Sequence, residues 1–193
     1  MKKIAVFCGS SEGNSQMIID LAYQLGVFLA ENEAELIYGG SKIGLMGKVA
    51  DGVLDTEGRV TGVIPDFLKT KDIVHPKLNE LIVTKNMHDR KVIMYEKSDA
   101  FVIIPGGFGT MEEVFEIATW GQLGLHSKPI AILNMGGYYN ALISQCKTMV
   151  ESGFLKTVNL EAIIIEDTIE ELFYKIEHYK PQPTPKWLNI DRV

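Results

Sequence analysis

The chain has 193 residues, of which 46% are hydrophobic and 23% charged, a composition and length that suit one globular domain of ordinary size. Its 19 Lys and Arg residues against 25 Asp and Glu residues give a formal net charge of −6, and no basic stripe interrupts this balance. Because proteins that bind nucleic acid usually show the opposite sign or a concentrated basic patch, we expect no nucleic-acid partner.

The sequence also lacks the marks of a membrane or secreted protein. No apolar run reaches the roughly 18 residues that span a bilayer. The start Met1-Lys2-Lys3 leads into an apolar run that is too short for the core of a secretory signal. The two cysteines, Cys8 and Cys146, cannot build a disulfide framework or a four-thiolate zinc site. We therefore expect a cytoplasmic protein with no membrane partner.

Short apolar runs rich in β-branched residues recur along the chain. Most are continuous instead of alternating, which indicates strands buried on both faces. The expected strands are residues 4–8, 36–38, 60–64, 81–84, 101–104, 130–133 and 163–165. Between them lie segments with helical spacing, namely a first one with Ile18, Leu21, Ala22, Leu25, Phe28 and Leu29 on one face, then 45–54, 86–97, 110–123, 138–152 and 168–179.

Strands that alternate with helices imply right-handed crossovers and a covered parallel sheet. We therefore predict an α/β fold, a Rossmann-like doubly wound parallel sheet of about seven strands with helices on both faces. No internal repeat or low-complexity segment divides the chain. Pro181, Pro183 and Pro185 cannot continue a helix, so we expect one domain at residues 1–180 and a C-terminal extension at 181–193.

Four of the expected strands lead into turns rich in glycine and small polar residues. These turns are residues 9–13, 39–44, 105–110 and 134–137. In an open parallel sheet, ligands bind beyond the carboxyl ends of the strands. Glycine lets backbone amides come close to a ligand, and each turn leads into a helix N-terminus with partial positive charge. One such turn alone would indicate only a tight connection, but several together predict a phosphate or nucleotide site.

Familiar motifs for other chemistries are absent. There is no Gly-x4-Gly-Lys-Ser/Thr loop, and the first turn lacks Gly-x-Gly-x-x-Gly, which argues against a P-loop NTPase and a standard dinucleotide site. The histidines do not show a metal-binding spacing, so we expect neither a metal nor a cofactor; they are His75, His88, His126 and His178.

Two segments contain candidate functional side chains. Thr110 followed by Glu113 fits a helix capping box, but Glu113 could equally face the phosphate site, and spacing alone does not separate the two interpretations. Arg90 and Lys91 lie near the expected N-terminus of the helix at 86–97, where cations oppose the helix dipole unless an anion lies nearby. This local conflict indicates either a functional site or a solvated basic face.

Four segments together resemble the LOG (Lonely Guy) family. Residues 105–113, Pro-Gly-Gly-Phe-Gly-Thr-Met-Glu-Glu, match its signature Pro-Gly-Gly-x-Gly-Thr-x-x-Glu. Residues 38–47 resemble its glycine-rich second turn, 87–91 its Met-His-x-Arg-Lys segment, and 119–126 the stretch after the signature helix. The resemblance runs from Ile4 to about Gly153 in the same order. One departure is Ser41, where many members have a third glycine.

The resemblance implies an enzyme, a nucleoside 5′-monophosphate phosphoribohydrolase. Such an enzyme hydrolyses the N-glycosidic bond of N6-substituted adenosine 5′-monophosphates (cytokinin riboside 5′-monophosphates) or AMP, and releases the free base and ribose 5-phosphate without a cofactor. Many relatives have the older name lysine decarboxylase, but no lysine here lies in a recognisable Schiff-base context. The resemblance also implies a homodimer with a small-molecule nucleotide substrate.

The resemblance assigns roles to individual residues. Glu113 would be catalytic by stabilising a cationic sugar and orienting water, and Arg90 would be its catalytic partner. Substrate binding would fall to Asp72, Arg90, Lys91, Gly107, Phe108, Gly109, Thr110, Met111, Glu112, Glu113 and Thr119. Asp72 is one methylene shorter than the Glu of the relatives. Further candidates for the pocket are Ser10, Gly40 and Ser41.

A non-catalytic alternative remains open at this point. The same architecture resembles molybdenum cofactor carrier proteins, so the chain could bind a nucleotide-like ligand without cleaving it. A carrier needs the phosphate-binding loop but not the pair Arg90 and Glu113, so this pair discriminates between the two functions.

Overall fold

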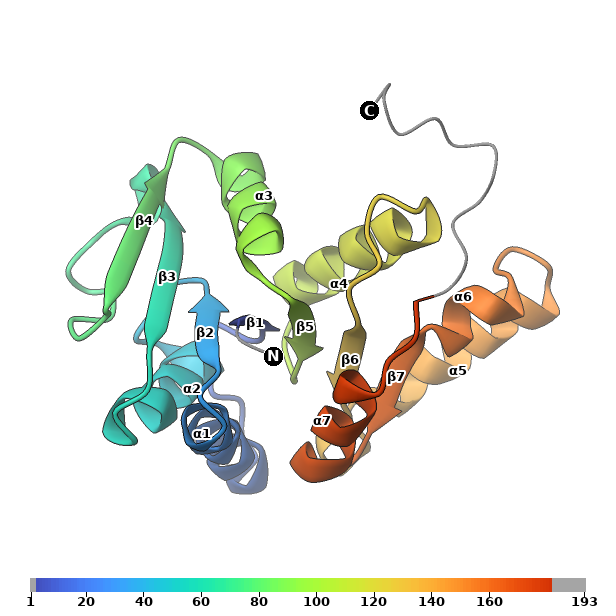
Figure 1. The fold of residues 1–193 in the computed structure, drawn as a ribbon, viewed down its shortest axis with the longest axis horizontal. Helices are drawn as coiled ribbons and strands as arrows, with labels where there is room; N and C mark the ends of the chain where they lie inside the picture. The colour runs from blue at the N-terminus through green and yellow to red at the C-terminus, as the bar shows by residue number, and fades with distance from the viewer. Residues whose placement is uncertain (1–2, 182–193) are drawn as a thin grey trace.

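The computed structural model describes residues 3–181, in which seven strands form one parallel sheet (Figure 1). The strand order is β4-β3-β2-β1-β5-β6-β7, and each neighbouring pair is parallel. The strands are β1 (Lys3–Phe7), β2 (Glu35–Tyr38), β3 (Val60–Pro65), β4 (Glu80–Thr84), β5 (Ala100–Ile103), β6 (Ile130–Leu133) and β7 (Ile163–Glu166). The predicted doubly wound α/β fold is confirmed, with a strand at each expected run.

Helices cover both faces of this sheet. Their bounds are α1 (Gln16–Glu31), α2 (Gly44–Asp55), α3 (Met87–Lys97), α4 (Phe108–Gln122), α5 (Asn140–Glu151), α6 (Thr157–Glu161) and α7 (Ile169–Glu177). The short α6 has no counterpart among the expected helices, and α4 begins two residues earlier than expected. None of the described helices has the length and apolar character that a membrane crossing requires. Residues 182–193, most of the expected extension, lie outside the described part of the chain.

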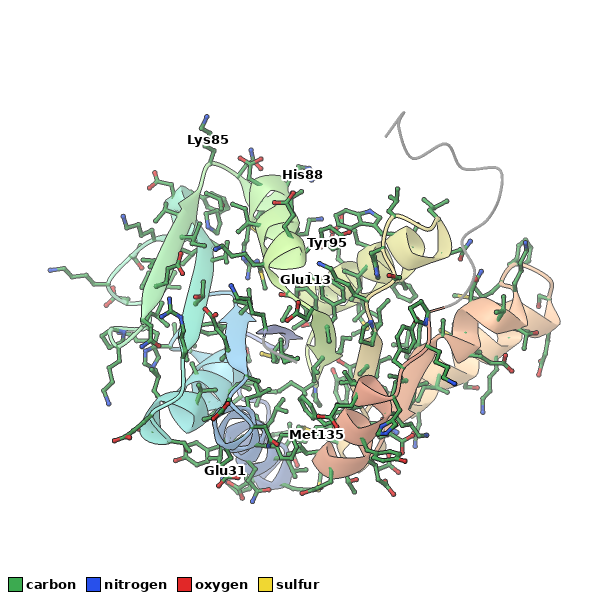
Figure 2. All side chains as sticks on the ribbon, in the orientation of Figure 1. Glu31, Lys85, His88, Tyr95, Glu113 and Met135 are labelled. Atoms are coloured by element: carbon green, nitrogen blue, oxygen red, sulfur yellow. The ribbon has the colours of Figure 1, made fainter. Side chains whose placement is uncertain are left out.

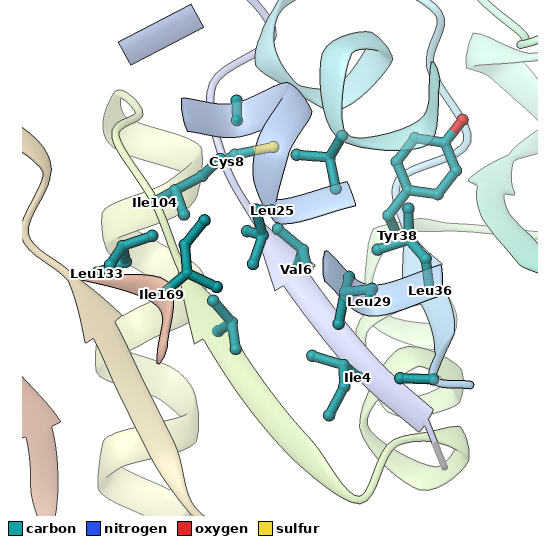
Figure 3. Packing of buried hydrophobic residues seen from close by; sticks show 14 of the residues in the cluster. Ile4, Val6, Cys8, Leu25, Leu29, Leu36, Tyr38, Ile104, Leu133 and Ile169 are labelled. Carbon is teal, nitrogen blue, oxygen red and sulfur yellow. The ribbon is translucent and has the colours of Figure 1, made fainter. Parts of the chain in front are cut away.

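The alternation of side chains along the strands divides the core into two layers. Ile4 and Val6 face α1, α2 and α7, and Figure 3 shows their packing against Leu25, Leu29 and neighbouring residues. The intervening Ala5 and Phe7 belong to the other layer, under α3, α4 and α5. Because successive side chains of a strand point to opposite faces, an apolar residue at every position needs helices on both sides.

The chain reverses its direction of travel across the sheet between β1 and β5. Strands β1 to β4 extend the sheet one way, and β5 to β7 extend it the other way from β1 (Figure 1). Connections leave β1 and β5 on opposite faces, so a crevice opens beyond their carboxyl ends. This is the switch point at which open α/β sheets bind their ligands.

Candidate active site

A cavity of about 460 Å³ lies beyond the carboxyl ends of the strands, at this switch point. Residues from the turns after β1, β2 and β5 meet there, as the glycine-rich turns predicted. The turn after β6, residues 134–137, was expected to face the same crevice but does not line the cavity. Instead, Tyr138 and Tyr139, which follow this turn, donate hydrogen bonds to backbone carbonyl groups after β5 without lining the cavity.

The turn after β5, which we call the signature loop (residues 105–110), leads directly into α4. Gly107 is the N-cap of this helix and has no side chain to cap it, so the first backbone N–H groups of α4 are left for another acceptor. An added Cβ at Gly107 or Gly109 would meet nothing within 4 Å. Open space in front of a helix N-terminus suits an anion such as a phosphate.

The capping-box interpretation of Thr110 and Glu113 is wrong. Because α4 begins at Phe108, Thr110 is the third helical residue and Glu113 lies in the second turn, where no orphan N–H remains for it to accept. Glu113 instead lines the cavity. Figure 2 shows it near the centre of the molecule, between α3 and α4. The glycine pair at 106 and 107 shifted the helix start, because glycine is itself a frequent N-cap residue.

Glu113 faces Arg90 of α3 across the cavity. The Arg90 Nη1 and Glu113 Oε1 atoms are 3.7 Å apart, and each side chain is only 12% exposed. Arg90 Nε also donates a hydrogen bond of 3.0 Å to the carbonyl of Val63 within β3. A Cβ on Gly39 would lie 2.3 Å from Arg90 Nη2, so the absence of a side chain there gives the guanidinium its room.

Burial raises the pKa of Glu113 to about 7, and the charge of Arg90 opposes this rise without cancelling it. The carboxyl group therefore changes charge near neutral pH, which suits an exchange of protons with water. Burial and the nearby Glu113 also raise the pKa of the Cys8 thiol at the end of β1, so this cavity residue is not an activated nucleophile.

Lys91 makes a separate connection between the same two helices. Its Nζ atom contacts Oε1 of Glu112 at 2.5 Å and Oε1 of Glu116 at 2.9 Å, and its side chain is 10% exposed. Although burial acts against it, these hydrogen bonds hold the pKa of Lys91 above its usual value. The negative charges near Arg90 and Lys91 at the start of α3 are therefore carboxylates of α4. Lys91 also links α3 to α4, the two helices to which Arg90 and Glu113 belong.

The structure brings together some of the residues that the sequence singled out. The cavity is lined by Ser10, Ser41, Arg90, Gly107, Phe108, Gly109, Thr110 and Glu113. It is not lined by Gly40, Asp72, Lys91, Met111, Glu112 or Thr119. Asp72 is exposed in the segment between β3 and β4, and Thr119 lies near the C-terminal end of α4 at a second cavity. The binding roles of these six residues stay predictions.

Other lining residues were not assigned to the site from the sequence. They include Cys8, Gly39, Met46, Leu68, Ile73 and Met94. Gly39 is the first residue of the predicted glycine-rich turn at 39–44. Its place directly after an expected strand was the sequence signal that could have assigned it to the cavity. Leu68 and Ile73 come from an irregular segment without a motif, and only the folded chain places them at the cavity.

Comparison with known proteins agrees with this geometry. The family model described as "Possible lysine decarboxylase" matches residues 46–176. A probable cytokinin riboside 5′-monophosphate phosphoribohydrolase of Arabidopsis thaliana is 44% identical, over 94% of this chain and 90% of that protein. A probable one from Oryza sativa subsp. japonica is 43% identical, over 93% and 85%. The chain belongs to the LOG family of phosphoribohydrolases.

Solved structures show how widely the LOG fold is shared. The structural-genomics target TM1055 is 27% identical with a TM-score of 0.72, over 93% of this chain and 100% of that one. The molybdenum cofactor binding protein of Rippkaea orientalis is 24% identical with a TM-score of 0.70, over 92% and 96%. At that identity the likeness to the cofactor carrier concerns the fold alone, and the carrier function is not favoured for this LOG protein.

The buried carboxyl group predicts that Glu113→Gln stabilises the protein above neutral pH. A pKa that rises from 4.5 to about 7 on folding means that the folded state binds more protons, so stability falls between these two pH values and stays lower above them. The difference corresponds to about 3 kcal/mol. We expect a higher Tm for Glu113→Gln than for the unmodified protein at about pH 8, and nearly equal values at about pH 4.

Thermal denaturation at the two pH values measures this effect. Glu112→Gln is the matched control, because Glu112 is the neighbouring carboxylate on α4 and is 55% exposed. A Tm at about pH 8 that rises equally in both variants, or in neither, would contradict a buried, costly Glu113.

Proposed function

We propose that this protein hydrolyses the N-glycosidic bond of adenosine 5′-monophosphates, either N6-substituted ones or AMP itself, to the free base and ribose 5-phosphate. The observation that supports this most is the buried pair Arg90 and Glu113 beside the open N-terminus of α4. Such a site offers one place for a phosphate and, in the same cavity, one carboxylate for a sugar cation. The names of its LOG relatives describe this reaction for cytokinin riboside 5′-monophosphates.

The reaction breaks the bond between C1′ of the ribose and a nitrogen of the base. Positive charge develops on the sugar as the bond breaks, as in glycoside hydrolysis. Ionised Glu113 would stabilise this charge and accept a proton from the attacking water, whose oxygen joins C1′. The leaving nitrogen of the base takes up a proton from solvent, and Glu113 then releases the water's proton to solvent, so that protons balance. Arg90 stays protonated, so its role would be a hydrogen bond to the substrate and the orientation of Glu113.

The phosphate would bind at the signature loop. The free N–H groups of Gly107, Phe108 and Gly109 and the buried hydroxyl of Thr110 would contact its oxygens. Because binding energy from a part of the substrate remote from the reacting bond can orient that bond, a nucleoside without the phosphate is expected to be a poor substrate.

Glu113→Gln tests the proposal directly. The substitution keeps the shape of the side chain and removes its charge, so hydrolysis of AMP and of isopentenyladenosine monophosphate should fall on the order of 10²-fold or more, about 3 kcal/mol of transition-state stabilisation. Release of free base is followed by chromatography, with Glu170→Gln, which removes an exposed carboxylate on α7 away from the cavity, as the control that keeps activity. Near-normal turnover by folded Glu113→Gln would remove the catalytic role and favour a binding function.

The pH profile of kcat/KM gives a second test. Because ionised Glu113 is the active form, kcat/KM should fall tenfold per pH unit below about 7. The substrate phosphate titrates near pH 6, which adds a separate acid limb. The residual activity of Glu113→Gln should retain the limb near 6 and lose the one near 7. A profile that is identical in the two proteins would assign the limb near 7 to another group.

We also propose that the protein is a homodimer that associates through α4 and its neighbours. A second cavity of about 130 Å³ lies between α4, α5, α6 and the sheet, with a mainly apolar lining that contains Thr119. Phe115 on its rim is 43% exposed, and Phe154 between α5 and α6 is 89% exposed. Burial of such side chains by a second subunit would be favourable.

Sedimentation velocity measures the oligomeric state. We expect a dimer for the unmodified protein and dissociation for Phe115→Glu, because the substitution places a charge on the proposed interface. Tyr174→Glu, at an exposed position on α7, is the control that should remain dimeric. A monomer before substitution would refute the proposal.

A further inference from the structure

Three consecutive carbonyl groups accept hydrogen bonds from residues outside the signature loop: that of Ile104, directly before the loop, and those of its first two residues. Two of the donors are hydroxyls of adjacent tyrosines, and one is a backbone amide. The bonds are Tyr139 Oη to the carbonyl of Ile104 (2.8 Å), Gly9 N to that of Pro105 (2.9 Å) and Tyr138 Oη to that of Gly106 (2.7 Å).

The bond from Tyr138 determines which way one amide of the loop points. A trans peptide unit is planar, and its oxygen and its hydrogen lie on opposite sides. When the Gly106 carbonyl points to Tyr138, the N–H of Gly107 in the same peptide unit must point away from it. Gly107 lines the cavity and Tyr138 does not, so this geometry directs the N–H of the α4 N-cap away from the supporting side.

The loop needs such a support from outside. Gly106 and Gly107 have no side chains that could limit the rotation of their peptide units. Gly106 has no room for one, because a Cβ there would lie 2.1 Å from Thr110 Oγ1. A phosphate-binding loop gains affinity when its N–H groups already point at the anion before it binds.

The turn after β6 brings the two tyrosines into place. Gly136 and Gly137 have φ values of 58° and 75°, which turn the chain back toward the loop. The Asn134 side chain accepts a hydrogen bond of 2.8 Å from the Tyr139 amide, and the two tyrosine rings pack edge to face at 4.9 Å. Tyr139 is buried, whereas Tyr138 is 49% exposed. Tyr138 therefore reaches Gly106 from a turn that these contacts fix, although the residue itself is half exposed.

We propose that Tyr138 is a positioning residue for phosphate recognition, acting on the Gly107 amide through the Gly106 carbonyl without touching the substrate. The inference rests on the proposed function, because it assigns the phosphate to the signature loop. Tyr139 bonds the chain two residues earlier, at the carbonyl of Ile104 directly before the loop, which lies further along the chain from the free amides.

The experiment compares ligands that represent the two halves of the nucleotide. Ribose 5-phosphate contains the phosphate and adenine lacks it, and titration calorimetry measures the binding of each without turnover. For Tyr138→Phe, which removes only the hydroxyl, we expect the Kd of ribose 5-phosphate to rise about tenfold and that of adenine to stay unchanged. In steady-state kinetics with AMP, KM should rise and kcat should change little.

Tyr174→Phe is the matched control, because it removes a hydroxyl from an exposed tyrosine on α7, outside the cavity. Unchanged binding of ribose 5-phosphate by Tyr138→Phe would overturn the proposal, and equal weakening of both ligands would assign Tyr138 a general structural role instead. Tyr139→Phe is a second variant, for which we expect a smaller loss in the same ligand.

The binding measurements separate this inference from the proposed reaction. If the unmodified protein binds ribose 5-phosphate but releases no base from any nucleotide, hydrolysis is refuted, and the comparison of Tyr138→Phe with Tyr174→Phe still tests the role of Tyr138. If turnover is normal and Tyr138→Phe binds ribose 5-phosphate and adenine with the same Kd values as the unmodified protein, only the role of Tyr138 is refuted.

Discussion

A carboxyl group held out of water beside a guanidinium is the interaction on which the candidate site depends. Glu113 and Arg90 are both largely buried, and their closest atoms are 3.7 Å apart. Desolvation raises the pKa of Glu113 to about 7 against the attraction of Arg90, so the folded protein pays for a carboxylate that is ready to ionise near neutral pH. A group of this kind destabilises the ligand-free fold and is retained where chemistry requires it.

Much of the surrounding structure keeps this pair in place. Arg90 and Glu113 come from α3 and α4, the helices on either side of β5 in the chain. Lys91 connects the same helices through Glu112 and Glu116, and the missing side chain of Gly39 leaves the space that the guanidinium occupies. The geometry of this pair therefore depends on contacts between elements, not on one loop.

The end of the site that we propose for the phosphate is built differently, from backbone amides instead of charges. The glycine-rich signature loop provides open N–H groups at the start of α4, and Gly9 and Tyr138 donate hydrogen bonds to two of its carbonyl groups. A molybdenum cofactor binding protein shares the fold, so the sheet and its helices do not by themselves select a reaction. The side chains that meet at the switch point make the difference, and here they include Arg90 and Glu113.

The amino-acid sequence alone determined the architecture and the position of the site along the chain. Continuous apolar runs predicted all seven strands, since a strand buried on both faces leaves no polar positions, and the glycine-rich turns predicted the carboxyl ends at which the cavity lies. The motifs at 87–91 and 105–113 also predicted the family to which the chain belongs.

Only the tertiary structure decided between interpretations that spacing leaves equal. The start of α4 at Phe108, with Gly107 as its N-cap, excluded the capping box, and the packing of α3 beside α4 placed Glu113 opposite Arg90. Likewise, the turn at 134–137 supports the signature loop from behind, although it resembles the ligand-facing turns in sequence. A local sequence pattern indicates which backbone conformations are possible. The burial of Glu113, its pKa and its distance from Arg90 depend on residues that are far apart in the chain and meet only in the folded protein.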